Sequence, residues 1–108
     1  MRKLVGQSFT CEITEDDIAL GLHGHPFGCP VARAIERAIN RPKHVVSVFP
    51  KEAALLTGRP LHRRIIGSID LPAPILRFIK DFDKGREVKP LTFVATIEER
   101  IGDPHAIK

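Results

Sequence analysis

The chain has 108 residues, of which 43% are hydrophobic and 28% charged, and its net charge is +4. This balance is typical of one globular domain that buries a single core without disulfides or metal ions, and it excludes a disordered or fibrous chain. No apolar run approaches the roughly 20 residues of a membrane span, and no long apolar stretch follows Arg2 and Lys3 as in a signal peptide. We therefore expect one cytoplasmic domain over residues 1–108, without membrane contact and with frayed ends at 1–6 and 102–108.

The charges are unevenly distributed along the chain. The segment from Arg33 to Arg64 contains eight basic residues and only two acidic ones, whereas residues 12–17 contain four carboxylates and no base. A fold that keeps these two segments apart has a basic face, which attracts phosphate backbones or acidic protein surfaces. The residues expected to form this face are Arg33, Arg37, Arg41, Lys43, Arg63 and Arg64.

The first predicted elements are a strand and a short helix. Residues 9–13 alternate between apolar and polar, a pattern that predicts a half-buried strand with Cys11 facing the core. Thr14 is expected to cap the following helix, with Asp17 in the reciprocal position of a capping box. Gly21 is expected to end this helix in the left-handed conformation.

A loop rich in glycine and proline, residues 21–28, precedes the most clearly predicted helix. Cys29 takes the N-cap position and Pro30 the first helical position, where the missing N–H of proline removes no hydrogen bond. An apolar stripe at helical spacing continues to residue 39, and Pro42 prevents continuation of the helix. The stripe consists of Val31, Ala34, Ile35, Ala38 and Ile39.

The rest of the chain predicts mostly strands. Residues 50–59 are ambiguous, because the segment 52–56 has helical propensity. The other predicted elements are strands over residues 44–49, 61–69 and 91–98, and a helix over residues 75–82 that Gly85 closes. The expected fold is α+β, a two-layer arrangement in which a mostly antiparallel sheet of about four strands carries two main helices on one face.

Two stretches together resemble small uncharacterised proteins of bacteriophage and bacterial genomes. One is the Cys29-Pro30 helix start, and the other is the pattern FI-x-x-FD-x-G-x-x-V-x-P-x-x-F from Phe78 to Phe93. The similarity spans most of the chain and brings no known activity, so it assigns no catalytic residue. It implies a phage-type accessory protein that acts in the bacterial cytoplasm by binding and inhibiting a host component.

His23, His25 and Cys29 are the candidates for a metal site. Zinc accepts these ligand types, and Cys11 or His44 would supply a fourth ligand. The spacing matches no established zinc motif, however, and two histidines in a polar, glycine-rich loop need no metal to explain them. We therefore expect no metal and no cofactor.

Cys29 is also a candidate reactive thiol. A cysteine at a helix N-terminus has a lowered pKa, and Arg33 one turn later would lower it further. A catalytic cysteine also needs a base, for which His25 is the only nearby candidate. The alternative is that Cys29 only caps the helix, and we expect the protein not to be an enzyme. With no export signal, Cys11 and Cys29 are expected to be free thiols rather than a disulfide.

The basic face fits two classes of partner. Arg33 and Arg37 lie one turn apart on a helix and Arg41 follows, so this row could track a phosphate backbone. The sequence lacks Trp and Tyr, and Phe27 alone looks free to stack on bases, which disfavours nucleic acid. Our first hypothesis is an acidic host protein and our second is nucleic acid, with a metal- or thiol-dependent activity as the third. A homodimer is compatible with each of them.

Overall fold

The computed structural model describes residues 6–41, 44–49, 53–57 and 63–98. In chain order these residues form β1 (Ser8–Ile13), α1 (Glu15–Leu20), α2 (Pro30–Ile39), β2 (His44–Val48), β3 (Ala53–Thr57), β4 (Arg64–Asp70), α3 (Ala73–Asp83) and β5 (Leu91–Glu98). Most of the ends that we expected to fray, residues 1–5 and 102–108, lie outside this range. Gly6 lies inside it, and its amide donates a 2.7 Å hydrogen bond to the Ile97 carbonyl.

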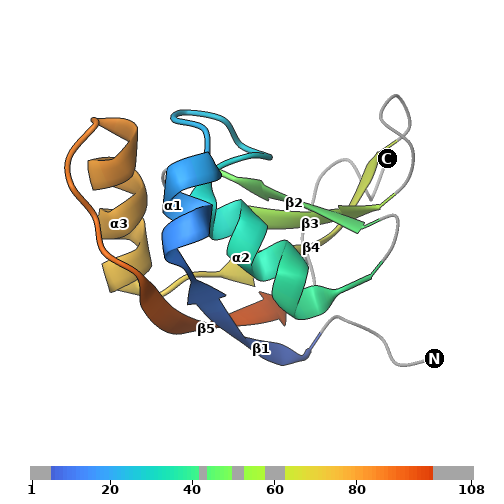
Figure 1. Cartoon of the computed structure of the whole chain (residues 1–108). Coiled ribbons are helices and arrows are strands. Elements are labelled where there is room, and N and C mark those ends of the chain that lie inside the picture. The colour runs from blue at the N-terminus through green and yellow to red at the C-terminus, as the bar shows by residue number, and fades with distance from the viewer. Residues whose placement is uncertain (1–5, 42–43, 50–52, 58–62, 99–108) are drawn as a thin grey trace.

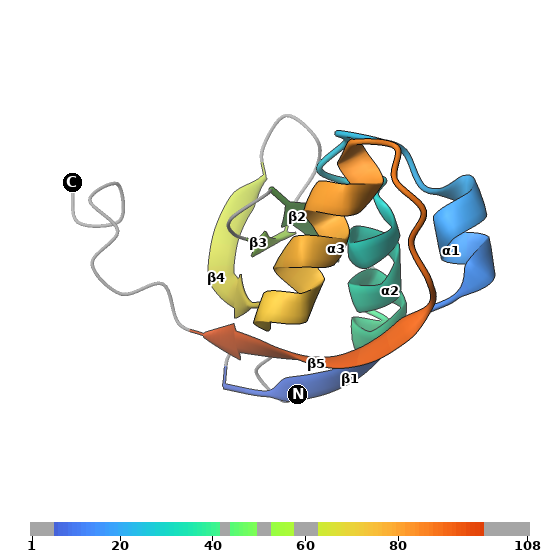
Figure 2. The same ribbon diagram turned by 90° about the vertical axis from the view of Figure 1, so that its left-hand side faces the viewer.

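The strands form one antiparallel sheet in the order β1-β5-β4-β3-β2. The sheet curls around α2 and α3, and α1 packs beside α2 (Figures 1 and 2). The predicted α+β architecture is therefore confirmed, with five strands in place of four. No helix in the described part of the chain is long and apolar enough to cross a membrane.

The additional strand is β3, in the segment that the sequence left ambiguous. Residues 52–56 have helical propensity, but Ala53–Thr57 pairs with β2 on one side and β4 on the other. Ala53 and Leu55 are buried on the concave face of the sheet. Ladder hydrogen bonds on both sides, together with this burial, outweigh the small intrinsic preference for a helix.

Helix α2 lies at the centre of the core. All but one of the predicted stripe residues are buried, and Ala38 is partly buried. Complete burial of a side chain such as Val31 or Ile35 stabilises the fold by roughly 1.5–3 kcal/mol. Ala32, outside the stripe, is also buried, because α2 contacts β1, β2 and α1. Asn40 ends the helix in the left-handed conformation (φ 49°).

The capping box of α1 is as predicted, but the end of this helix is not. The Thr14 hydroxyl accepts a hydrogen bond from the Asp17 amide, and the Asp17 carboxylate accepts one from the Thr14 amide. Gly21 is extended (φ −69°, ψ 152°), so the predicted left-handed conformation is wrong. Glycine is needed here for a close approach, because a Cβ would lie 2.6 Å from the Asp17 carbonyl oxygen and 2.7 Å from the Pro30 ring.

The free edge of β2 is closed by neighbouring segments. The amide of His44 donates to the Arg41 carbonyl (3.3 Å) and the amide of Val48 to the Pro26 carbonyl (2.8 Å). Between them, the Val46 amide donates to the Glu36 carboxylate of α2 at 3.0 Å. The amides on this edge are therefore occupied within the chain, and the loop before α2 is tied to the end of β2.

Candidate binding surface

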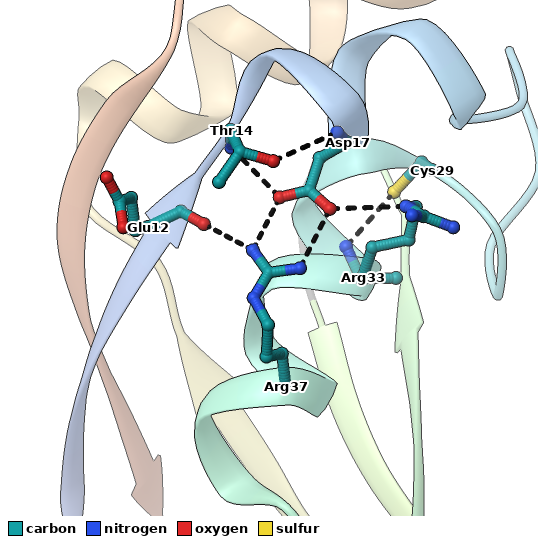
Figure 3. Close-up of polar contacts among 7 residues, drawn as sticks. Glu12, Thr14, Asp17, Cys29, Arg33 and Arg37 are labelled. Carbon is teal, nitrogen blue, oxygen red and sulfur yellow. Dashed lines mark hydrogen bonds and ion pairs between the residues drawn. The ribbon is translucent and has the colours of Figure 1, made fainter.

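The acidic and basic segments meet at a buried carboxylate on α1. The Asp17 side chain is 0% exposed and accepts hydrogen bonds from Arg37 Nη2 (2.6 Å), Arg37 Nη1 (3.0 Å) and Arg33 Nε (3.2 Å) (Figure 3). Arg37 Nη2 also donates to the Glu12 carbonyl at 2.7 Å. The fold thus brings the acidic segment 12–17 into contact with α2 of the basic segment, whereas the predicted basic face requires the two segments to lie apart.

Hydrogen bonds and the charge of Arg37 help to lower the pKa of Asp17 by more than burial raises it. Burial alone would raise the pKa of this carboxyl, but hydrogen bonds from Arg37 and Thr14 and the charge of Arg37 hold the pKa well below its ordinary value. Asp17 is therefore ionised at neutral pH and balances part of the charge of Arg33 and Arg37. These two arginines, 36% and 50% exposed, are fixed to the protein and present less free positive charge than predicted.

Of the other predicted basic residues, Arg41, Arg63 and Arg64 lie within the described part of the chain. Arg41 is partly buried and has an interaction partner, and Lys43 lies outside the described residues. Arg63 lies over the Phe27 ring, with its guanidinium carbon 4.9 Å from the ring centroid. Arg64 is exposed at the start of β4. Arg63 is therefore the basic residue that the structure places beside an exposed aromatic ring.

His23 is held by α3 rather than directed towards a metal. Its ring stacks on Phe82 with 4.2 Å between centroids and 2° between planes. Its Nδ1 lies 2.7 Å from the Phe82 carbonyl oxygen, which can only accept, so Nδ1 carries the proton. The next amide, of Gly24, donates to the Asp83 carboxylate at 2.9 Å. Among the described residues, no group of three histidine, cysteine or acidic side chains is arranged to hold a metal ion.

Cys29 caps α2 as predicted, but its thiol is not activated. Its Sγ accepts from the Ala32 amide at 3.5 Å, and the residue is 5% exposed. Burial raises the pKa of Cys29, and the nearby Asp83 carboxylate raises it further. The predicted lowering of the pKa is therefore wrong, because burial outweighs the hydrogen bonds from the backbone amides at the start of α2. Arg33, which was expected to assist, forms an ion pair with Asp17. Cys11 and Cys29 are both free thiols, as expected.

The loop before α2 forms one wall of a small cavity. The cavity has a volume of about 160 Å³, and its walls are mostly apolar. They comprise Gly24, His25, Pro26, Cys29, Val48, Phe49, Ile79 and Asp83. His25, Cys29 and Asp83 thus share a cavity, which the sequence did not indicate for Asp83, but no hydrogen bond joins these side chains within the described part of the chain.

Two exposed aromatic rings accompany the cavity. Phe27 and Phe49 are 39% and 47% exposed, and the His25 ring lies edge-on to Phe27 at 6.4 Å between centroids. Together with Arg63 they form what we call the Phe27 surface, defined as His25, Phe27, Phe49 and Arg63. The sequence predicts that Phe27 is free to stack and that Phe49 belongs to a strand over residues 44–49. β2 ends at Val48, and Phe49 lies beyond it as an exposed residue.

No family model matches the chain, and neither does any curated protein or solved structure. The function is therefore inferred from the geometry of this surface.

Proposed function

We propose that this chain is a non-enzymatic binding domain that docks a protein partner on the Phe27 surface. The observation that carries this proposal is an exposed Phe27 under the Arg63 guanidinium, on the same loop that lines an apolar cavity. Aromatic residues and arginine are enriched at the centres of protein interfaces, where one anchoring side chain fills a pocket. A cavity of about 150 Å³ accepts a benzene-sized group, so this one has room for an aromatic or branched aliphatic side chain.

The loop that carries the Phe27 surface is also held in place by hydrogen bonds, so binding needs no rearrangement of it. His23 and Gly24 fix the loop to α3, and the Pro26 carbonyl fixes it to β2. A loop already ordered in this way loses little conformational entropy on binding. Arg63 supplies a positive charge beside Phe27, so the fitting partner has an acidic group next to its apolar anchor.

Nucleic acid is the second candidate, because exposed phenylalanine rings with a neighbouring arginine also stack on bases. One observation favours protein over it. Arg33 and Arg37, two of the three arginines in the row expected to follow a phosphate backbone, are bound to Asp17. The resemblance to phage-type proteins suggests that the partner is a bacterial host component, met in the cytoplasm, which the domain inhibits.

A pull-down from bacterial lysate tests the proposal with the variants Phe27→Ala and Arg63→Glu. The matched control is Val94→Ala, which removes an apolar side chain that is 53% exposed on β5. We expect wild type and V94A to retain the same protein after nuclease treatment, and F27A and R63E to lose it. Retention that disappears with nuclease would assign the surface to nucleic acid. Equal retention by F27A, R63E and wild type would contradict the proposal.

A further inference from the structure

The second edge of the sheet, β1, has a regular pattern of unpaired backbone groups. The Ile97 amide donates to the Gln7 carbonyl at 2.9 Å, which places Gln7 in a hydrogen-bonded pair with β5. In an antiparallel ladder such pairs alternate with residues that direct both N–H and C=O away from the neighbouring strand. Ser8, Thr10 and Glu12 are therefore the outward residues, as the bond from Arg37 to the Glu12 carbonyl confirms.

Ser8 and Thr10 leave this edge open. β1 is the terminal strand of the sheet, and no described residue pairs with its outer side along Ser8 and Thr10 (Figure 2). Both residues are exposed, and the register of β1 with β5 is continuous from Ser8 to Ile13. Just before Ser8, Gly6 (φ 89°) and Gln7 both bond to Ile97, as in a β-bulge, so the regular edge begins at Ser8. Proteins usually protect such an edge with lysine, proline or a bulge, and within β1 none of these is present. The edge thus offers two N–H and two C=O groups in the geometry of a strand.

We propose that two copies of this chain associate through antiparallel pairing of β1 with β1. With Phe9 on the two-fold axis, Ser8 of each copy lies opposite Thr10 of the other. Each of these pairs exchanges an N–H and a C=O, so the backbone groups of Ser8 and Thr10 are satisfied in both copies. Phe9, partly buried against the core, then lies opposite Phe9 of the second copy, where aromatic pairs add stability.

A second copy is the occupant that this edge fits, for three reasons. The open groups of Ser8 and Thr10 are arranged symmetrically about Phe9, as an interface on a two-fold axis requires. Among the described residues the pairing places no like charges opposite each other, since the Glu12 residues of the two copies lie at opposite ends of the paired segment. Since the amides along β2 are occupied within the chain, the assembly closes at two copies instead of growing into a filament.

The variant Thr10→Pro tests this pairing with little risk to the fold. The Thr10 N–H points away from β5, so proline removes no ladder hydrogen bond, and proline is tolerated on edge strands. Thr10→Val keeps the N–H and serves as the matched control. In sedimentation analysis at micromolar to near-millimolar concentrations, we expect wild type and T10V to have twice the chain mass and T10P to be a monomer. A monomeric wild type over this range, or dimeric T10P, would overturn the proposal.

Amide exchange of the wild-type protein gives an independent result that needs no variant. The Ser8 and Thr10 amides should be protected at high concentration and should lose this protection on dilution, whereas the Val46 amide should stay protected throughout. Fast exchange at Ser8 and Thr10 at every concentration would contradict the pairing even if T10P failed to fold. The Phe27 surface is not part of this interface, so F27A should dimerise as the wild type does.

Discussion

The backbone groups on the outer sides of β1 and β2 are hydrogen-bonded to different extents, although helix α2 contacts both strands. On β2 the Glu36 carboxylate of α2 accepts from a strand amide, with backbone carbonyls on either side. On β1 the Arg37 guanidinium of α2 donates to a strand carbonyl and then to Asp17. An acidic side chain can satisfy only N–H groups and an arginine only C=O groups. The sign of each charge on α2 therefore decides which backbone groups it covers, and on β1 it leaves Ser8 and Thr10 uncovered.

The largest loss of stability is expected from Asp17→Asn. This variant breaks the anchor of the β1 edge, namely the Asp17 carboxylate that holds Arg37 against the Glu12 carbonyl. The neutral amide keeps the cap to Thr14 but cannot balance the two arginines. We expect unfolding in urea to show a loss of about 2–3 kcal/mol, less than the 3–5 kcal/mol of a fully buried pair, because both arginines can turn to solvent. The exposed neighbour variant Asp16→Asn should change stability by less than about 0.5 kcal/mol. A loss for D17N as small as that for D16N would contradict the structural role of Asp17.

The same anchor should respond to acid. The folded-state pKa of Asp17 lies below its unfolded value of about 3.9. Its contribution is therefore complete above that value and is lost as the pH falls towards the folded-state pKa. Melting temperatures of wild type and D17N should differ by a constant amount from pH 7 to about pH 5 and converge below about pH 4. A gap that is unchanged at pH 2.5, well below the reference pKa of aspartate, would show that the contribution is not ionic.

Removing the Glu36 carboxylate from the β2 edge by Glu36→Ala should lower the free energy of unfolding by less than D17N does. This variant leaves the Val46 amide without its charged acceptor, so we expect a loss of about 1–2 kcal/mol and faster exchange of that amide. Glu36→Gln retains an acceptor oxygen and should lose less than half as much. Equal losses for the two variants would show that the hydrogen bond is unimportant and that packing accounts for the effect.

The smallest expected effect is on local opening at β1, which the Cys11 thiol can report. This thiol is fully buried, and burial raises its pKa to about 11. In a Cys29→Ser background, which keeps a capping side chain on α2, Cys11 should react slowly with a thiol reagent at pH 8. D17N should accelerate the reaction, and E36A should leave it nearly unchanged. Equal acceleration by both variants would mean that the edges open together.

Local patterns predicted most of the elements because their causes lie within a few residues. Thr14 and Asp17 form the capping box, and Cys29 and Pro30 begin α2, as spacing alone predicts. The burial of the apolar stripe on α2 follows from helical periodicity in the same way. Only β3 was unresolved, since its conformation depends on strands on either side of it.

The candidate surface was harder to predict because it depends on distant contacts. Asp17 serves both as a cap and as the partner of Arg33 and Arg37, and the second role exists only because α1 packs on α2. Asp83 reaches the His25 cavity from the end of α3, 58 residues along the chain. No spacing rule connects residues so far apart, so a sequence pattern shows their identity but not that they share a site.

The position of β1 also has a consequence for the order in which the molecule is made. Among the described strands β1 leaves the ribosome first, but its described neighbour in the sheet is β5, which leaves after the other four. Strands β2, β3 and β4 follow one another and pair in that order, so hairpins can form during synthesis. Because distant pairings form slowly, β1 stays unpaired until β5 emerges. A nascent chain stalled before Leu91 would expose both sides of β1 and is the species that we expect chaperones to bind.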